Sequence, residues 1–98
     1  MINRDRETRP MPWQWLSFAD PHLPPGTQFL GVAIVEADGV IDAAIEAHRL
    51  RINPGGEVLC AELPGCTPPV RWQNVLLGRE EAEAAMAWVD NQVKGNRL

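Results

Sequence analysis

The sequence predicts an α+β fold with the element order β-β-α-β-α, in which a small three-stranded mixed sheet packs with two helices. Three observations lead to this prediction. Short stretches rich in aromatic and aliphatic residues, at 13–19, 28–37 and 57–63, are typical of strands. Apolar residues recur at helical spacing at 40–51 and 79–93. Clusters of Pro, Gly, Asn and Asp separate these stretches and indicate turns.

The first two predicted strands are the most apolar parts of the chain. Trp13–Ala19 is rich in aromatic residues, and the stretch 28–37 has apolar side chains on both of its faces. A strand that is apolar on both faces is typically central, so we expect helices or another subunit to cover it on both sides. One face is expected to carry Leu30, Val32 and Ile34, and the other Phe29, Ala33 and Val35.

Each predicted helix has an apolar stripe that we expect to face the core. The first helix should end before Asn53-Pro54-Gly55-Gly56, because proline cannot continue a helix and Asn or Gly can take the left-handed conformation that closes one. Its stripe consists of Ile41, Ala44, Ile45, His48 and Ile52. The stripe of the second helix consists of Ala82, Ala85, Met86, Val89 and Val93, with Trp88 at its edge.

The order of the elements predicts how they connect. The second strand, the first helix and the third strand form a β-α-β unit, which predicts parallel strands with a right-handed crossover. The first strand is expected to pair antiparallel with the second, and residues 70–77 are predicted to be irregular. Residues 1–12 are expected to form a flexible arm, and residues 13–98 a single globular domain.

Charge and composition narrow the class of protein. The net charge is −4, and residues 28–66 hold six acidic side chains and two arginines. A nucleic-acid partner is therefore disfavoured, because backbone phosphates are bound by clustered Lys and Arg. No apolar run approaches the length of about 18 residues that a membrane span needs, and the first residues lack a signal-peptide pattern. We expect a cytoplasmic protein with reduced cysteines and no membrane contact.

The residues that bind metals or act as nucleophiles do not form a recognisable motif. Structural zinc sites bring ligands in closely spaced pairs, and neither Cys60 with Cys66 nor His22 with His48 has that spacing. We therefore expect no metal, no cofactor and no catalytic residue. The alternative left open is a site near His48 or Cys66, completed across a dimer interface. The favoured interpretation of His48 is a structural ring at the edge of the core.

The four tryptophans are the feature that most favours binding of a partner. Trp13 and Trp15 share one face of the first predicted strand, and Trp72 follows a proline pair in a loop. Tryptophan supplies core packing, but it is also enriched in the residues that dominate binding energy at protein interfaces. We expect at least one of these three residues to contact a partner.

The stretch from Val35 to Val58 ends in Asn-Pro-Gly-Gly-Glu-Val, after a strand that ends in Glu-Ala and a short alanine-bearing helix. In these features it resembles small uncharacterised proteins of bacteria and their phages. A looser similarity continues in Asn74-Val75-Leu76-Leu77 and Arg79-Glu80-Glu81. The resemblance spans about half of the chain and implies no activity. It favours a phage- or prophage-linked accessory role.

Together these observations predict a small non-enzymatic protein-interaction module, an accessory protein or inhibitor that binds another protein or a second copy of itself. The alternative is a small enzyme or ligand-binding subunit with the site near His48 or Cys66. The sequence does not identify the partner.

Overall fold

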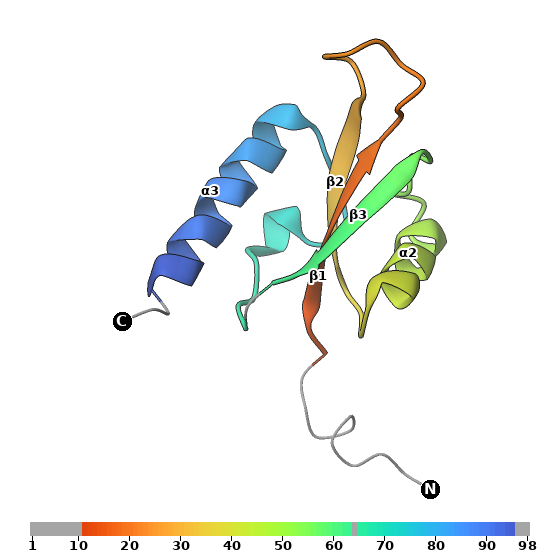
Figure 1. Ribbon diagram of the computed structural model, residues 1–98. Helices are drawn as coiled ribbons and strands as arrows, with labels where there is room; N and C mark the ends of the chain where they lie inside the picture. Colours follow the sequence, from red (N-terminus) through yellow and green to blue (C-terminus); the bar gives the residue numbers. More distant parts are fainter. Residues whose placement is uncertain (1–10, 64, 96–98) are drawn as a thin grey trace, which may run out of the picture.

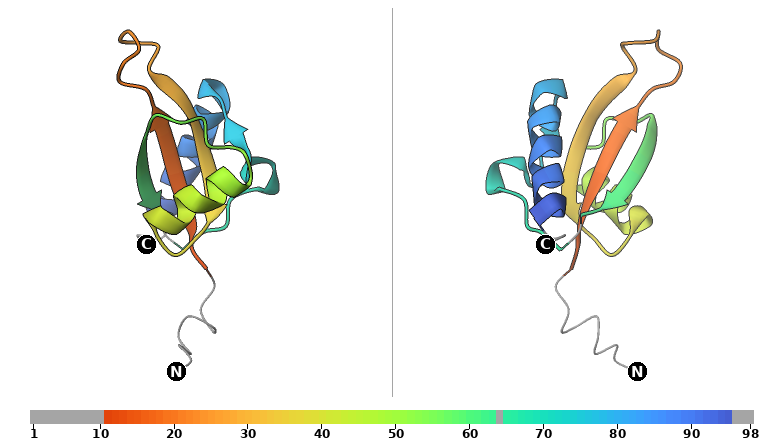
Figure 2. Two further views of the ribbon diagram at one scale, coloured as in Figure 1. Left: turned by 90° about the vertical axis from the view of Figure 1, so that its right-hand side faces the viewer. Right: turned by 60° about the vertical axis from the view of Figure 1, so that its left-hand side comes forward.

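The computed structural model describes residues 11–63 and 65–95 and confirms the α+β class. A four-stranded sheet has the order β3-β1-β2-β4, and two helices lie on opposite sides of it (Figures 1 and 2). The elements in chain order are β1 (Trp13–Ala19), β2 (Phe29–Glu36), α2 (Val40–Arg49), β3 (Glu57–Glu62), the 3-10 turn η1 (Val70–Trp72), β4 (Leu76–Leu77) and α3 (Arg79–Gly95). The predicted flexible arm, residues 1–12, lies outside the described residues except for Met11 and Pro12.

The prediction of a three-stranded mixed sheet is wrong, because the strands of this sheet all pair antiparallel and there is a fourth one. β1 pairs antiparallel with β2, as expected, but β3 pairs with β1 and not with β2. β2 and β3 therefore run in the same direction with β1 between them. The β-α-β pattern indicated the relative direction of these two strands, and it missed that the doubly apolar β1 separates them.

The segment predicted to be irregular contains both η1 and β4. β4 has only two residues, which is too short for an alternating pattern to be visible in the sequence. Its Leu77 lies opposite Val32, and its Leu76 lies opposite Ala33. The sheet edge beside β2 is thus covered by a strand that only the three-dimensional pairing defines.

A bulge in β2 changes which residues face which helix. Phe18 pairs with Gly31, whereas Ala19 pairs with Phe29, so Leu30 is an extra residue in this strand. Gly31 takes a φ of 144°, and an added Cβ there would lie 2.6 Å from the Leu76 side chain. The bulge places Phe29 beside Val32 and Ile34 and places Leu30 on the opposite side, which reverses the predicted faces of these two residues.

The sheet separates two apolar clusters, as the apolar character of both faces of β2 predicted. On the α3 side, aromatic and aliphatic residues of β1, β2 and η1 pack against buried alanines of α3. On the α2 side, Leu16, Phe18, Ala33 and Val35 pack against α2. Most of the predicted α3 stripe is buried or half-buried, but Met86 is exposed.

The prediction that the stripe of α2 faces the core is wrong for Ile41, Ile45 and His48, whereas Ile52, beyond the end of the helix, does pack against the core. The fully buried residues of α2 are Ala43 and Ala47, whereas Ile41, Ile45 and His48 are exposed on the opposite side of the helix. Only small side chains let the helix backbone approach the bulky residues of β1 and β2 closely. The helix ends at Arg49. Two residues later Arg51 takes a left-handed φ of 62°, and the amides of Arg51 and Ile52 donate to the carbonyls of His48 and Ala47.

The Gly55-Gly56 pair that leads into β3 provides a matched test of this fold. Both residues have positive φ, but only Gly56 lies so close to β1 that an added Cβ would fall 2.4 Å from the Ala19 carbonyl oxygen. We expect Gly55→Ala to lower the free energy of unfolding by about 1–2 kcal/mol, the penalty for a left-handed residue with a Cβ. Gly56→Ala should lower it by about 1–3 kcal/mol more, because the backbone must also move. Urea unfolding of the two variants measures the difference, and equal losses would contradict the close approach of this turn to β1.

Candidate functional site

The three tryptophans predicted to bind a partner are buried in the described structure. Trp13, Trp15 and Trp72 are 9%, 8% and 3% exposed, and all belong to the cluster under α3. Trp72 donates from Nε1 to a Glu81 carboxylate oxygen at 2.8 Å and packs edge-to-face on Trp88, with ring centroids 6.2 Å apart. These contacts explain why Trp72 is part of the hydrophobic core. The partner-binding role of all three residues stays a prediction.

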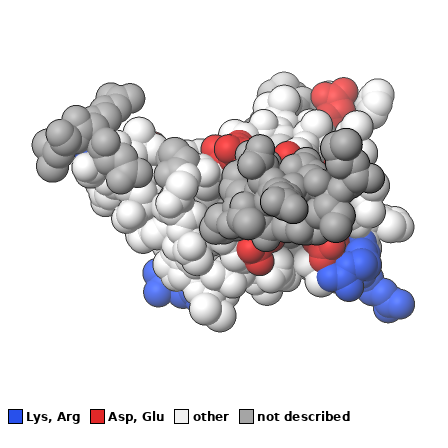
Figure 3. All heavy atoms as spheres, turned by 90° about the horizontal axis from the view of Figure 1, so that it is seen from below, with Lys and Arg blue, Asp and Glu red and all other residues white. Residues whose placement is uncertain are grey.

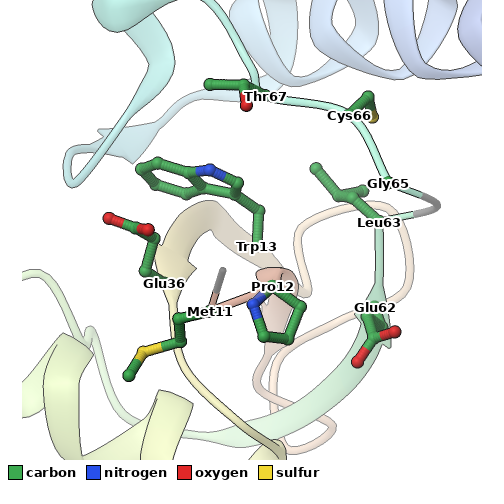
Figure 4. A pocket seen from close by; sticks show the side chains of 9 residues that line it. All are labelled: Met11, Pro12, Trp13, Glu36, Glu62, Leu63, Gly65, Cys66 and Thr67. Atoms are coloured by element: carbon green, nitrogen blue, oxygen red, sulfur yellow. The ribbon is translucent and has the colours of Figure 1, made fainter. Parts of the chain in front are cut away.

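Trp13 also forms a wall of a surface hollow at the end of the sheet where the chain enters β1 (Figure 4). This end hollow has a volume of about 390 Å³. It combines aliphatic side chains with two carboxylates and one thiol. Its lining residues are Met11, Pro12, Trp13, Glu36, Glu62, Leu63, Gly65, Cys66 and Thr67.

Neither cysteine has the surroundings of an activated nucleophile. Burial raises the pKa of the Cys66 thiol, and burial together with the nearby Glu62 carboxylate raises the pKa of Cys60. Cys60 donates from Sγ to Gln14 Oε1 at 3.4 Å. A raised pKa keeps a thiol protonated and unreactive at neutral pH. These two side chains therefore fit structural thiols.

His48 and Cys66, the two residues of the predicted alternative site, are not brought into one hollow. Cys66 lines the end hollow, whereas His48 is exposed on the outer side of α2 and lines neither this hollow nor the others described below. The favoured interpretation of His48 as a ring at the edge of the core is wrong. Because α2 packs on the sheet through Ala43 and Ala47, His48 lies on the exposed side of the helix. Within residues 11–63 and 65–95, no group of three or more His, Cys, Asp or Glu side chains is placed to hold a metal ion.

The outer side of α2 is the most exposed apolar helix surface of the described chain. Ile41 and Ile45 lie one turn apart and are 73% and 61% exposed, and His48 continues their row by another turn. We call this row of three residues the α2 face. The sequence pattern did reveal the row, but its helical spacing fits an inward or an outward stripe equally well.

One flank of the α2 face is acidic. A side hollow of about 290 Å³ lies between α2 and the chain before β1, and its lining combines four carboxylates with three apolar residues. These lining residues are Met11, Glu36, Ala37, Asp38, Asp42, Ile45 and Glu46. No Lys or Arg of the described chain lines this hollow. In the view from below, several separate acidic side chains are visible, and the visible Lys and Arg side chains lie at the lower left and lower right margins (Figure 3).

Arg49 of α2 is already engaged with this acidic flank. Its guanidinium forms an ion pair with Glu46, the residue one turn earlier, and donates from Nε to a carboxylate oxygen at 3.0 Å. The hydrogen bond from Arg49 lowers the pKa of the Glu46 carboxyl, so this group stays ionised well below neutral pH. Asp42 lies on the same flank, one turn before Glu46.

A third hollow lies on the other side of the sheet, between α3 and β1. Its volume is about 220 Å³, and it is mostly apolar, with one cation and one carboxylate at its rim. The lining residues are Trp15, Ser17, Phe29, Val32, Arg79, Ala82, Glu83 and Met86. Leu59 of β3 pairs with Ser17, so its side chain lies on the same face of the sheet as this hollow. The Leu59 side chain is 77% exposed.

The raised thiol pKa values predict slow, pH-shifted alkylation of the folded protein. At about pH 8, iodoacetamide should modify Cys60 and Cys66 several times more slowly in the native protein than in urea, because fewer of the thiols are ionised. The pH at which the rate rises should also be higher for the native protein. Intact-mass spectrometry on the Cys60→Ser and Cys66→Ser variants assigns the rates to single thiols. A Cys66 that reacts faster when folded would indicate an activated nucleophile in the end hollow.

Comparisons with known proteins provide no assignment. The sequence matches no protein-family model, no curated protein resembles it significantly, and no solved structure matches its fold significantly. In the described part of the chain, no helix is long and apolar enough to pass through a membrane. The function is therefore inferred from the geometry of the chain itself.

Proposed function

We propose that this protein is a small non-enzymatic interaction module that binds another protein through the α2 face. The observation that carries the proposal is the exposure of Ile41 and Ile45 as neighbours on the outside of a helix whose inner side is alanine. Single exposed aliphatic residues are common on protein surfaces. Two adjacent isoleucines at helical spacing form a continuous apolar row, which is the usual character of a helix surface that packs against a partner.

The construction of α2 supports this proposal. The helix is held to the sheet through Ala43 and Ala47, and the larger aliphatic residues of the helix point away from the core. If the isoleucines had a role only in folding, burial against the sheet would stabilise the chain, at about 1.5–3 kcal/mol for each side chain. Their exposure leaves that energy available for binding.

The other exposed apolar surfaces support binding less well. Leu59 is exposed on β3, an edge strand that begins with Glu57 and ends with Glu62. Charged residues at an edge strand oppose pairing with further strands. The hollow between α3 and β1 is apolar, but its volume of about 220 Å³ is below the usual range for small-molecule sites, about 300–1,000 Å³.

In this proposal Trp13 and Trp15 each line a surface hollow, whereas Trp72 stabilises the core. A partner that extends from the α2 face across Met11 meets the end hollow and with it Trp13, because Met11 and Glu36 line both this hollow and the side hollow. We propose the cytoplasm as the location of the protein. The Asn53–Val58 turn and the resemblance that it carries favour an accessory or inhibitory role linked to phages.

The end hollow favours a second candidate function, a small ligand-binding subunit or enzyme. Its volume of about 390 Å³ falls in the range of small-molecule sites, and its lining contains Cys66 and two carboxylates. The raised pKa of Cys66 and the position of His48 outside this hollow count against nucleophilic catalysis there.

Substitution on the α2 face tests the interaction proposal. We expect Ile41→Ser and Ile45→Ser to weaken binding of the natural partner by roughly tenfold each, because each removes an apolar contact at the centre of the interface. Affinity capture of the tagged protein from its native lysate with quantitative mass spectrometry identifies the partner. Titration of the purified partner then measures the loss.

Leu59→Ser is the matched control, because it removes an equally exposed aliphatic side chain from the other side of the molecule. Circular dichroism and urea unfolding establish that all three variants are folded. A partner that is retained by the two isoleucine variants and lost by Leu59→Ser would exclude the α2 face. Recovery of the bait alone would exclude the interaction proposal.

A further inference from the structure

We infer that the partner segment bound at the α2 face is an amphipathic helix of another protein, with Lys or Arg beside an aliphatic stripe. This inference rests on the proposed function, because it names the chemistry of the partner at the same surface. It has two parts, the helical form of the partner and its positive charge. Different observations on α2 and its flank support each part.

The spacing of the α2 face supports a helical partner. Ile41, Ile45 and His48 follow one another by four and three residues, which is the spacing of residues that interlock between two packed helices. Ile41 and Ile45 are exposed along the helix. Two hollows adjoin them, one at the start of α2 that Ile41 lines and the acidic side hollow that Ile45 lines. β3 offers an edge for strand addition, but its terminal glutamates oppose that mode.

The flank of the α2 face supports a basic partner. The side hollow beside Ile45 contains carboxylates from the end of β2 and from α2, and no Lys or Arg of residues 11–63 and 65–95 lines it. Arg49 of α2 is bound to Glu46. A partner helix packed on Ile41 and Ile45 therefore brings its flanking side chains next to Asp42 and Glu46, where Lys or Arg is attracted and Asp or Glu is repelled.

A second copy of this chain fits the surface less well than such a partner. Each copy carries a net charge of −4 and would bring the same acidic flank to the interface. α2 has ten residues, a length of about 15 Å, so two α2 faces alone offer little area toward the ~1,200 Å² of a stable interface. A longer basic helix can also cover the side hollow.

A selection experiment distinguishes the chemistry of the partner. Displayed helical peptides of about 15 residues carry an aliphatic stripe, and their flanking positions vary among Lys, Arg, Asp, Glu, Gln and Ala. Selection uses the wild-type protein, and peptides that also bind the Ile41→Ser/Ile45→Ser double variant are removed. We expect the retained peptides to contain a severalfold excess of Lys and Arg over Asp and Glu at the flanking positions.

Titration of one retained peptide by fluorescence anisotropy then tests the contacts. Ile45→Ser should weaken binding roughly tenfold, and Asp42→Asn about two- to threefold, with a loss of affinity as salt rises. Asp90→Asn, an exposed acid on α3, is the matched control and should leave the affinity unchanged. Binding that does not respond to salt or to Asp42→Asn would overturn the basic character of the partner.

The remaining outcomes separate this inference from the proposed function. Retained peptides with neutral or acidic flanks overturn the inference and leave the α2 face as a binding surface. If no helical peptide is retained, the inference fails, and the capture experiment with the isoleucine variants decides the proposed function independently. Sedimentation that reveals a dimer dissociated by Ile45→Ser would identify a second copy as the occupant and also overturn the inference.

Discussion

The antiparallel pairing of β1 with strands on both sides is the interaction on which the rest of the structure depends. β1 pairs with β2 along one edge and with β3 along the other, so its backbone is satisfied by segments from two distant parts of the chain. Its side chains divide between the two apolar clusters, with Trp13 and Trp15 under α3 and Leu16 and Phe18 under α2. The buried Gln14 on the α2 side is satisfied by the Ala37 carbonyl and the Cys60 thiol, which joins β1 to its neighbours.

This central strand determines what each helix can do. Bulky residues on the α2 side of β1 and β2 leave room only for alanines beneath α2, and the isoleucines must then lie outside. The α3 side is different, because three tryptophans fill the space between the sheet and a longer helix that also presents buried alanines. The exposed row of isoleucines is therefore a consequence of close packing on the inner side of α2, and it creates the surface that we propose for binding.

The electrostatic character of that surface also depends on the fold. Glu36 ends β2, whereas Asp42 and Glu46 belong to α2, and the turn between these elements brings their carboxylates to one hollow. Arg49 neutralises part of this group through Glu46 and leaves the flank acidic. A net charge of −4 alone would disfavour nucleic acids without indicating a preferred partner. The local arrangement of these charges next to an apolar row is what favours a basic helix.

The sequence alone determined the α+β class. It also determined both ends of β1 and of β3, and the first residue of each helix, to within a residue or two. These features follow from strand and helix periodicities and from Pro/Gly turns, which are local properties of the chain. The sequence also revealed the isoleucine row of α2. Tertiary structure alone decided the position of β1 between β2 and β3, the two-residue strand β4, the bulge at Leu30 and the outward direction of that row. These features depend on which surfaces meet across the sheet. A period of 3.6 residues defines a stripe on a helix. Only the size of the opposing side chains decides whether that stripe or the alanines beside it are buried.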